Sequence, residues 1–463
     1  MPSNSDSCCA GFRRNQNEGR LGGTSMRLWF QGIIAGLLML LAGCGGISPG
    51  HEQAVPKPGH GDLPSQATLH ATEASDKLEI WSYYDLGERN RAKIRELLPD
   101  LDISFQVASY YQAIDLYKKA LTRDEVPDIF ILETAWLGSF NDSLAFEDLA
   151  ASPYEAESLL EPYPESILAP FRTLDGAGLI ALPFDMNPAV TYYRYDVMQE
   201  AGLPAEPEAL ARFMEEPDNW LHIAQTLKQR NQWSIAWGSD PLDIFSKNTS
   251  FFDSELSFAH NNEQIARAIE LGRAIENQKL ASMSNIFDKN NNSIQSEDTV
   301  MFHTGYWYRY MLEELAPEQS GNWRITRLPF NAYGWSGSSA VAIAAKSANK
   351  DAAWQAAEWL ATGYSRYIEE LLHADAGSPN AYFGGQKLEP LVRELILRMP
   401  AYTFTPLDEK ANRIWREVWT EEKDDSSLTA QEVASLMEQR VMEELAPQIE
   451  VLQHYLQESR KAN

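Results

Sequence analysis

The sequence of 463 residues is 44% hydrophobic and 11% aromatic, a composition that excludes a disordered protein because so much apolar ring surface must be buried. Its 66 acidic and 39 basic residues give a formal net charge of −27, which would repel nucleic acid and other polyanions. The only cysteines are Cys8, Cys9 and Cys44, and the eight histidines show no zinc-binding spacing. We therefore expect no disulfide, no catalytic thiol, no metal and no other cofactor in the chain after Cys44.

An export signal is predicted near the start of the chain. Arg27 provides a positive charge, and residues 28–41 form an apolar stretch. This stretch is shorter than the ~20 residues needed to span a bilayer and is typical of a secretory signal. The adjoining Leu41-Ala42-Gly43-Cys44 resembles the lipobox of bacterial lipoproteins, which implies cleavage before Cys44 and attachment of a lipid to its thiol. We interpret residues 1–43 as an N-terminal extension plus this signal peptide.

A tether and then alternating strands and helices are predicted after the signal. Residues 44–77 are rich in Gly, Pro, Ser and Ala without hydrophobic periodicity, which is typical of a flexible tether. Residues 129–132 are apolar at every position, as in a central strand covered on both faces. The order strand–helix–strand–helix–strand predicts a doubly wound α/β fold, in which ligands bind beyond the carboxyl ends of the strands. These five elements are expected around residues 78–81, 94–98, 103–107, 112–122 and 129–132.

The remaining elements are predicted from shorter patterns. A capping box at residues 429–432 predicts the start of a helix whose buried stripe includes Val433, Leu436 and Val441. We also expect an extended segment over 178–188 leading into 190–195, helices after 218–220 and at 264–278 and 351–361, and strands at 299–302 and 341–345.

A series of segments, taken in chain order, carries a family resemblance: Leu78–Trp81, Glu125–Phe130, Leu182–Asp185, Tyr192–Val197, Thr299–Trp307, Leu328-Pro329, Gly337–Ala344 and Ala352–Trp354. They resemble the family 1 extracellular solute-binding proteins, the maltose-binding-like receptors of ABC importers. No single segment is specific, but the ordered series together with the lipobox is. Glu133 and Met186-Asn187 depart from the residues more usual at their positions, so the resemblance leaves the identity of the ligand open.

The resemblance implies an α/β fold like that of periplasmic binding proteins, with two lobes, each a mostly parallel sheet flanked by helices, and the ligand in the cleft between them. Lobe 1 would comprise residues 78–187 and 340–375, and lobe 2 would comprise residues 188–339 and 376–463. Hinge motion would close the lobes over the ligand. The crossings between the lobes are expected near Asn187, Ser339 and Ala376.

Candidate ligand-binding residues are aromatic and polar side chains near the expected cleft. Aromatic rings stack on the apolar faces of sugars, while carboxylates and amides form hydrogen bonds with their hydroxyl groups. Each candidate follows a predicted strand, lies near a crossing between the lobes, or stands beside Gly or Ser where the backbone can approach closely. The alternative is ordinary core packing for any one tryptophan, and an exposed or hinge-capping position for any one carboxylate. The candidates are Tyr83, Tyr84, Glu133, Trp136, Asp185, Asn187, Trp237, Trp307, Trp335, Ser336 and Gly337.

The sequence and its resemblance predict a receptor rather than an enzyme. We expect a monomer, held on the outer face of the bacterial cell membrane by lipid on Cys44, that captures a sugar or oligosaccharide and delivers it to ABC permease subunits. The acidic balance favours one alternative, a cationic solute such as a polyamine. A second alternative is a ligand-sensing lipoprotein without a permease. A third is an enzyme on the same scaffold, either a thiaminase-like transferase, which the absence of cysteine after Cys44 disfavours, or a glycosidase with paired carboxylates.

Overall fold

The computed structural model describes residues 76–462, apart from 124, 143, 289 and 374–376. The predicted extension and signal peptide (1–43), the lipidation site Cys44, residues 44–75 of the predicted tether and the predicted crossing at Ala376 lie outside the described residues. Within the described part of the chain, no helix is both long and apolar enough to cross a membrane.

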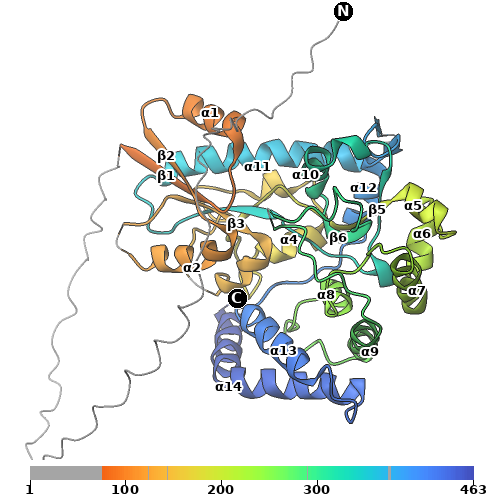
Figure 1. Ribbon diagram of the computed structural model, residues 1–463. Helices are drawn as coiled ribbons and strands as arrows, with labels where there is room; N and C mark the ends of the chain where they lie inside the picture. Colours follow the sequence, from red (N-terminus) through yellow and green to blue (C-terminus); the bar gives the residue numbers. More distant parts are fainter. Residues whose placement is uncertain (1–75, 124, 143, 289, 374–376, 463) are drawn as a thin grey trace, which may run out of the picture. The chain divides into compact units, whose positions relative to one another are not determined.

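Lobe 1 is built on a sheet of five strands: β1 (Lys77–Ser82), β2 (Asp102–Val107), β3 (Ile129–Glu133), β4 (Leu182–Phe184) and β8 (Ser339–Ile343). Their order across the sheet is β2-β1-β3-β8-β4, and the first three of these strands are labelled in Figure 1. β1 is parallel to β2 and β3, whereas β8 is antiparallel to β3 and β4. β3 is buried at every position, which confirms the central strand predicted from its unbroken apolar run.

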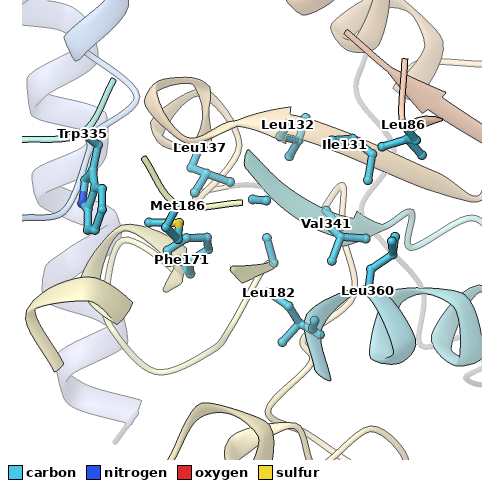
Figure 2. Close-up of a cluster of buried hydrophobic side chains, with 14 of the residues drawn as sticks. Leu86, Ile131, Leu132, Leu137, Phe171, Leu182, Met186, Trp335, Val341 and Leu360 are labelled. Carbon is cyan, nitrogen blue, oxygen red and sulfur yellow. The ribbon is translucent and has the colours of Figure 1, made fainter. Parts of the chain in front are cut away.

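Helices pack against this sheet and complete the core of lobe 1. They are α1 (Gly87–Leu97), α2 (Tyr110–Leu121), α11 (Lys350–His373) and the short α3 (Glu157–Leu160) and α4 (Glu165–Leu168). α11 packs along β4 and β8. Figure 2 shows Ile131 and Leu132 of β3, Leu182 of β4, Val341 of β8 and Leu360 of α11 in one cluster, in which each is at most 3% exposed. Burial of each such side chain stabilises the fold by about 1.5–3 kcal/mol.

Lobe 2 is built on three strands: β5 (Ala189–Arg194), β6 (Met301–Gly305) and β7 (Trp323–Thr326). β5 lies between β6 and β7 and is antiparallel to both, so the expectation of a mostly parallel sheet is wrong for lobe 2. β6 and β7 point the same way and are joined through α10 (Tyr308–Leu315), as in a βαβ unit. β5 enters from lobe 1 in the opposite direction and occupies the place between them.

A second hydrophobic core forms around the helices of lobe 2. Trp220 of α7, Ile269 of α9, Trp415 of α13 and Val433 of α14 are buried in it. The elements after β5, other than those already given, are α5 (Tyr195–Glu200), α6 (Pro207–Met214), α7 (Pro217–Lys228), α8 (Asp240–Phe245), α9 (Glu263–Gln278), α12 (Glu389–Leu397), α13 (Asp408–Glu422), α14 (Ala430–Ala462) and the short antiparallel pair β9 (Pro379–Asn380) and β10 (Gln386–Lys387).

The capping box that opens α14 is confirmed. The Thr429 backbone N–H donates to Glu432 Oε2 at 2.7 Å, and the Glu432 N–H donates to Thr429 Oγ1 at 3.2 Å. Val433 and Val441 are buried as predicted, but Leu436 is 36% exposed, so its place on the buried stripe is wrong. The stripe instead follows a spacing of four residues through Met437, which is buried.

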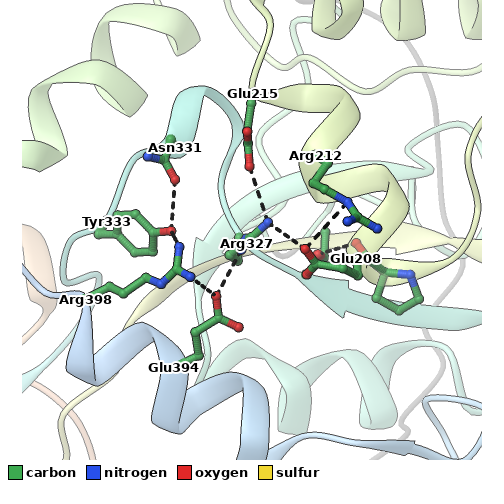
Figure 3. A network of polar contacts seen from close by, with 10 residues as sticks. Glu208, Arg212, Glu215, Arg327, Asn331, Tyr333, Glu394 and Arg398 are labelled. Atoms are coloured by element: carbon green, nitrogen blue, oxygen red, sulfur yellow. Dashed lines mark hydrogen bonds and ion pairs between the residues drawn. The ribbon is translucent and has the colours of Figure 1, made fainter.

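A network of ion pairs joins β7 to two helices of lobe 2. The Arg327 guanidinium, 8% exposed, lies 3.2 Å from a Glu208 oxygen, 3.4 Å from Glu215 and 2.9 Å from Glu394 (Figure 3). Glu208 belongs to α6 and Glu394 to α12. Since the guanidinium is buried, these carboxylates compensate its charge, and the network fixes where the chain leaves β7.

Candidate functional site

Two chain segments pass between the lobes side by side. One joins β4 to β5 through residues 185–188, and the other joins β7 to β8 through residues 327–338. The Ser336 N–H donates to the Asn187 carbonyl at 2.9 Å, and the Ser339 N–H donates to the Asp185 carbonyl at 3.0 Å. These bonds hold the two crossings together as a short antiparallel pair, which places Asn187 and Ser339, both predicted to lie near crossings, close to one another.

A cavity of about 630 Å³ lies beside these crossings, at the carboxyl end of β3. Its wall combines residues of lobe 1 with residues of lobe 2, and its size is within the range usual for small-molecule sites. Five candidate residues line it: Glu133, Trp136, Trp237, Trp335 and Ser336. The other six candidates, Tyr83, Tyr84, Asp185, Asn187, Trp307 and Gly337, are not among the lining residues in the described part of the chain.

Lobe 1 contributes a group of aromatic rings. The ring of Trp136 is centred 5.1 Å from that of Tyr83 and 5.4 Å from that of Tyr110. Tyr110 is 47% exposed and lines the cavity, but it is absent from the candidates predicted from the sequence. It follows the carboxyl end of β2, so the rule that singled out Tyr83 and Tyr84 would have found it too.

Lobe 2 contributes aromatic rings that line the cavity and one ring that supports a crossing. Trp237 is 39% exposed and lines the cavity, as does Phe287. Trp307 stacks on Phe287 with ring centres 6.1 Å apart, and its Nε1 donates to the Ser336 carbonyl at 3.1 Å. A Cβ on Gly337 would lie 2.4 Å from that Nε1. In this arrangement Trp307 and Gly337 pack against each other and support the crossing.

Three further candidates also connect parts of the fold. The Tyr83 hydroxyl forms a hydrogen bond with Ser339 Oγ at 2.7 Å, which ties the end of β1 to the start of β8. Asn187 Nδ2 donates to the Asp185 carbonyl at 3.1 Å and to the Gly337 carbonyl at 3.3 Å. Their ligand-binding role stays a prediction, and the alternative of a hinge cap has these contacts in its favour.

Glu133 is the buried carboxylate at the carboxyl end of β3. It is 6% exposed, and this burial raises its pKa to about 7, while Lys247 and the backbone N–H groups of Ala135 and Gly337 act in the opposite direction. Among the described residues, none forms a hydrogen bond with its Oε2 atom. Glu133 is therefore partly neutral at physiological pH and keeps an oxygen without a hydrogen-bond partner among the described residues.

Charged residues of lobe 2 line the same cavity and were missed. Burial raises the pKa of Asp240 to about 7 and that of Asp408 to about 6. The Phe251 N–H donates to Asp408 at 2.8 Å, and Arg416 forms an ion pair with Asp243. They lie on helices and loops of lobe 2 rather than at predicted strand ends, so only the tertiary fold brings them to the cavity.

Lys247 completes the charged lining from lobe 2. Burial lowers the pKa of its ammonium, and Asp243 and Glu133 raise it. In the described part of the chain no ion pair or hydrogen bond holds the Lys247 side chain. Its backbone is held closely, because a Cβ on Gly334 would lie 2.7 Å from the Lys247 carbonyl oxygen.

Comparison with known proteins identifies relatives of most of the chain. A family model described as bacterial extracellular solute-binding protein matches residues 98–365. A lactose-binding protein of Rhizobium radiobacter is 22% identical over 386 residues, which cover 74% of this chain and 87% of that protein.

Solved structures show the same architecture. The galacto-N-biose/lacto-N-biose I-binding protein of the ABC transporter from Bifidobacterium longum has a TM-score of 0.63 at 16% identity, covering 80% of this chain and 97% of that one. The sugar-binding protein MalE from Xanthomonas citri has a TM-score of 0.58 at 19% identity, covering 81% and 99%. The likeness confirms the predicted two-lobed α/β fold.

Proposed function

The chain belongs to the family of bacterial extracellular solute-binding proteins, and on this premise we propose that it captures a sugar or oligosaccharide for an ABC importer. The lactose-binding protein of Rhizobium radiobacter and the two solved structures named above are binding proteins rather than enzymes, which supports a receptor. Sugar as the ligand is supported by the sugars for which these relatives are named and by the lining of the cavity.

The observation that carries the proposal is the combination of rings and polar groups around one cavity. Trp136 and Tyr110 of lobe 1 and Trp237 of lobe 2 offer ring faces on opposite lobes. Glu133 offers a hydrogen-bond acceptor and Lys247 offers a donor, and both residues line the same cavity. Sugars need both, because each pyranose ring has an apolar face and a rim of hydroxyl groups.

Hinge closure is the second part of the proposal. The crossings at residues 185–188 and 327–338 run side by side, and the cavity beside them has walls from both lobes. A ligand that contacts both walls stabilises the closed arrangement over the open one, because only the closed arrangement makes all its contacts.

Anchoring by lipid on Cys44 is the third part. It is supported by the lipobox-like Leu41–Cys44 and by the export that the family implies. We propose that the protein acts as a monomer on the outer face of the cell membrane and delivers its ligand to permease subunits. Mass spectrometry of the membrane-extracted protein tests the anchor, since a diacylglyceryl group on an N-terminal Cys44 is expected and an unmodified residue contradicts it.

The ligand is tested by identifying the small molecules that the purified protein retains and binds. Mass spectrometry of the co-purifying small molecule, followed by thermal shift against neutral sugars and polyamines, should identify a sugar. Its affinity, measured by calorimetry, should change little between low and high salt. An affinity for a polyamine that falls steeply with salt would instead favour a cationic solute.

A further inference from the structure

Four polar side-chain atoms around the cavity are buried and have no hydrogen-bond partner among the described residues: Glu133 Oε2, Ser234 Oγ, His303 Nε2 and Trp335 Nε1. All four residues line the cavity. Glu133, Ser234 and Trp335 are 6%, 2% and 8% exposed. A buried polar atom without a partner destabilises a protein by about 1–3 kcal/mol, so four around one cavity indicate that a ligand supplies the missing bonds.

The hydrogen-bonding role of His303 follows from its neighbour on β5. Thr191 Oγ1 lies 2.8 Å from the Arg327 carbonyl and 2.9 Å from His303 Nδ1. The carbonyl only accepts, so the single Thr191 hydroxyl proton goes to it, and His303 Nδ1 must donate to Thr191. Burial lowers the pKa of His303 to about 3, so the ring is neutral. Its Nε2 atom is therefore an acceptor.

Lys247 and Glu133 face one another electrostatically from different lobes. Each acts on the pKa of the other, yet no ion pair joins them in the described part of the chain. The two groups are therefore not in direct contact, and both line the same cavity. A cation bound there gains from Glu133 and is repelled by Lys247, and the reverse holds for an anion.

We propose that the cavity selects an uncharged ligand with neighbouring hydroxyl groups, to which Glu133 and His303 Nε2 are acceptors and Lys247 and Trp335 Nε1 are donors. A hydroxyl group both donates and accepts, so one chemical group satisfies all four. An ammonium cannot accept from Lys247 or Trp335, and a carboxylate cannot donate to Glu133 or His303. The unpartnered atoms are covered in this conformation, and lobe movement or side-chain rotation brings them into contact with the ligand. The inference rests on the proposed function and adds to it that the ligand carries no charge.

The first test compares sugars that differ only in charge. We would measure binding of galactose, galacturonate and galactosamine, and of glucose, glucuronate and glucosamine, by thermal shift and calorimetry, with lactose and a wider sugar library alongside. The neutral member of a binding trio should bind about tenfold or more tightly than either charged member. A charged member that binds as tightly would overturn the inference and leave the proposed function standing. If no sugar of either kind binds, both fall.

A second test replaces His303 with two amide side chains of different length. His303→Asn keeps a group near the Nδ1 position that can donate to Thr191, but it removes the acceptor at the Nε2 position. It should weaken binding of the neutral sugar about tenfold and leave the unfolding temperature of the unliganded protein close to that of the wild type. His303→Gln reaches the Nε2 position and should restore much of the affinity. Unchanged affinity in His303→Asn contradicts the role of His303.

A third test compares, within each variant, the affinity for the charged sugar with the affinity for the neutral sugar. This ratio does not depend on the fraction of the protein that is folded. Glu133→Gln should reduce the rejection of galacturonate, because it removes one of the negative charges that oppose Lys247, while Asp243 remains. Lys247→Met should reduce the rejection of galactosamine for the converse reason. Lys346→Met removes a lysine whose Nζ contacts the Arg123 carbonyl outside the cavity and should leave both ratios unchanged. Ratios that stay constant in the two cavity variants contradict selection by this pair.

Discussion

At the scale of single residues, close packing near the crossings determines the burial of Glu133 and the space available to Gly337. Glu133 lies at the carboxyl end of β3 and is 6% exposed, so water cannot stabilise its charge. Gly337 has a φ of +73°, and the Trp307 indole occupies the place of its missing Cβ. Both residues were predicted near the cleft from the sequence, but their burial and neighbours could not be.

Glu133→Gln is expected to stabilise the unliganded protein at about pH 8. Because burial raises the folded-state pKa to about 7, the neutral form is favoured in the fold, and stability is lost as pH rises from the unfolded-state value through 7. The gain should be at most about 2–3 kcal/mol at pH 8 and should disappear toward pH 4. Thermal unfolding across this range measures it, with the exposed Glu161→Gln as control. A gain independent of pH would contradict this account.

Gly337→Ala is expected to destabilise the protein more than Gly176→Ala. Both glycines have a positive φ, +73° and +75°, but a Cβ on Gly176 meets nothing within 4 Å. The difference between the two variants therefore isolates the clash with Trp307 from backbone strain. We expect it to be about 1–3 kcal/mol by denaturant unfolding, and equal losses would mean that the Trp307 side chain moves aside freely.

At the scale of elements, the Arg327 network holds β7, α6 and α12 together (Figure 3). Arg327→Met leaves the carboxylates of Glu208, Glu215 and Glu394 close to one another without their shared cation. Hydrogen bonds to charged groups contribute about 1.5–3 kcal/mol, and the carboxylates left behind are 34–58% exposed, so we expect a loss of about 1.5–3 kcal/mol. Arg212→Met is the matched control, since Arg212 also reaches Glu208 but is 67% exposed. Its effect in urea unfolding should stay below about 1 kcal/mol, and similar losses in both variants would contradict a special role for Arg327.

At the scale of the whole molecule, the lobes contact each other beyond the crossings. Asn141 Nδ2 of lobe 1 donates to the Phe404 carbonyl at 2.6 Å. Lys118 of α2 forms an ion pair of 2.6 Å with Glu409 of α13, and Glu409 also lines the cavity. This pair joins one lobe to the other beside the proposed ligand, so it favours the arrangement in which both walls contact the ligand.

Glu409→Gln is accordingly expected to weaken ligand binding with little effect on folding. Exposed ion pairs contribute about 0.2–1 kcal/mol, so the affinity should fall by about 1.4- to fivefold in calorimetry at low salt, and the difference should shrink at high salt. Glu96→Gln breaks a similar exposed pair with Lys93 inside α1 and should leave the affinity unchanged. Equal effects of both variants would assign the loss to net charge rather than to contact between the lobes.

The sequence by itself determined the local elements and the family. The apolar run of β3, the capping box of α14 and the ordered motifs are short-range patterns that depend on neighbouring residues alone. Only the tertiary structure decided the antiparallel place of β5, because pairing partners more than a hundred residues apart leave no periodic signal. It also decided the lining of the cavity. Lys247, His303 and Asp408 come from separate elements, and the packing of those elements brings them together.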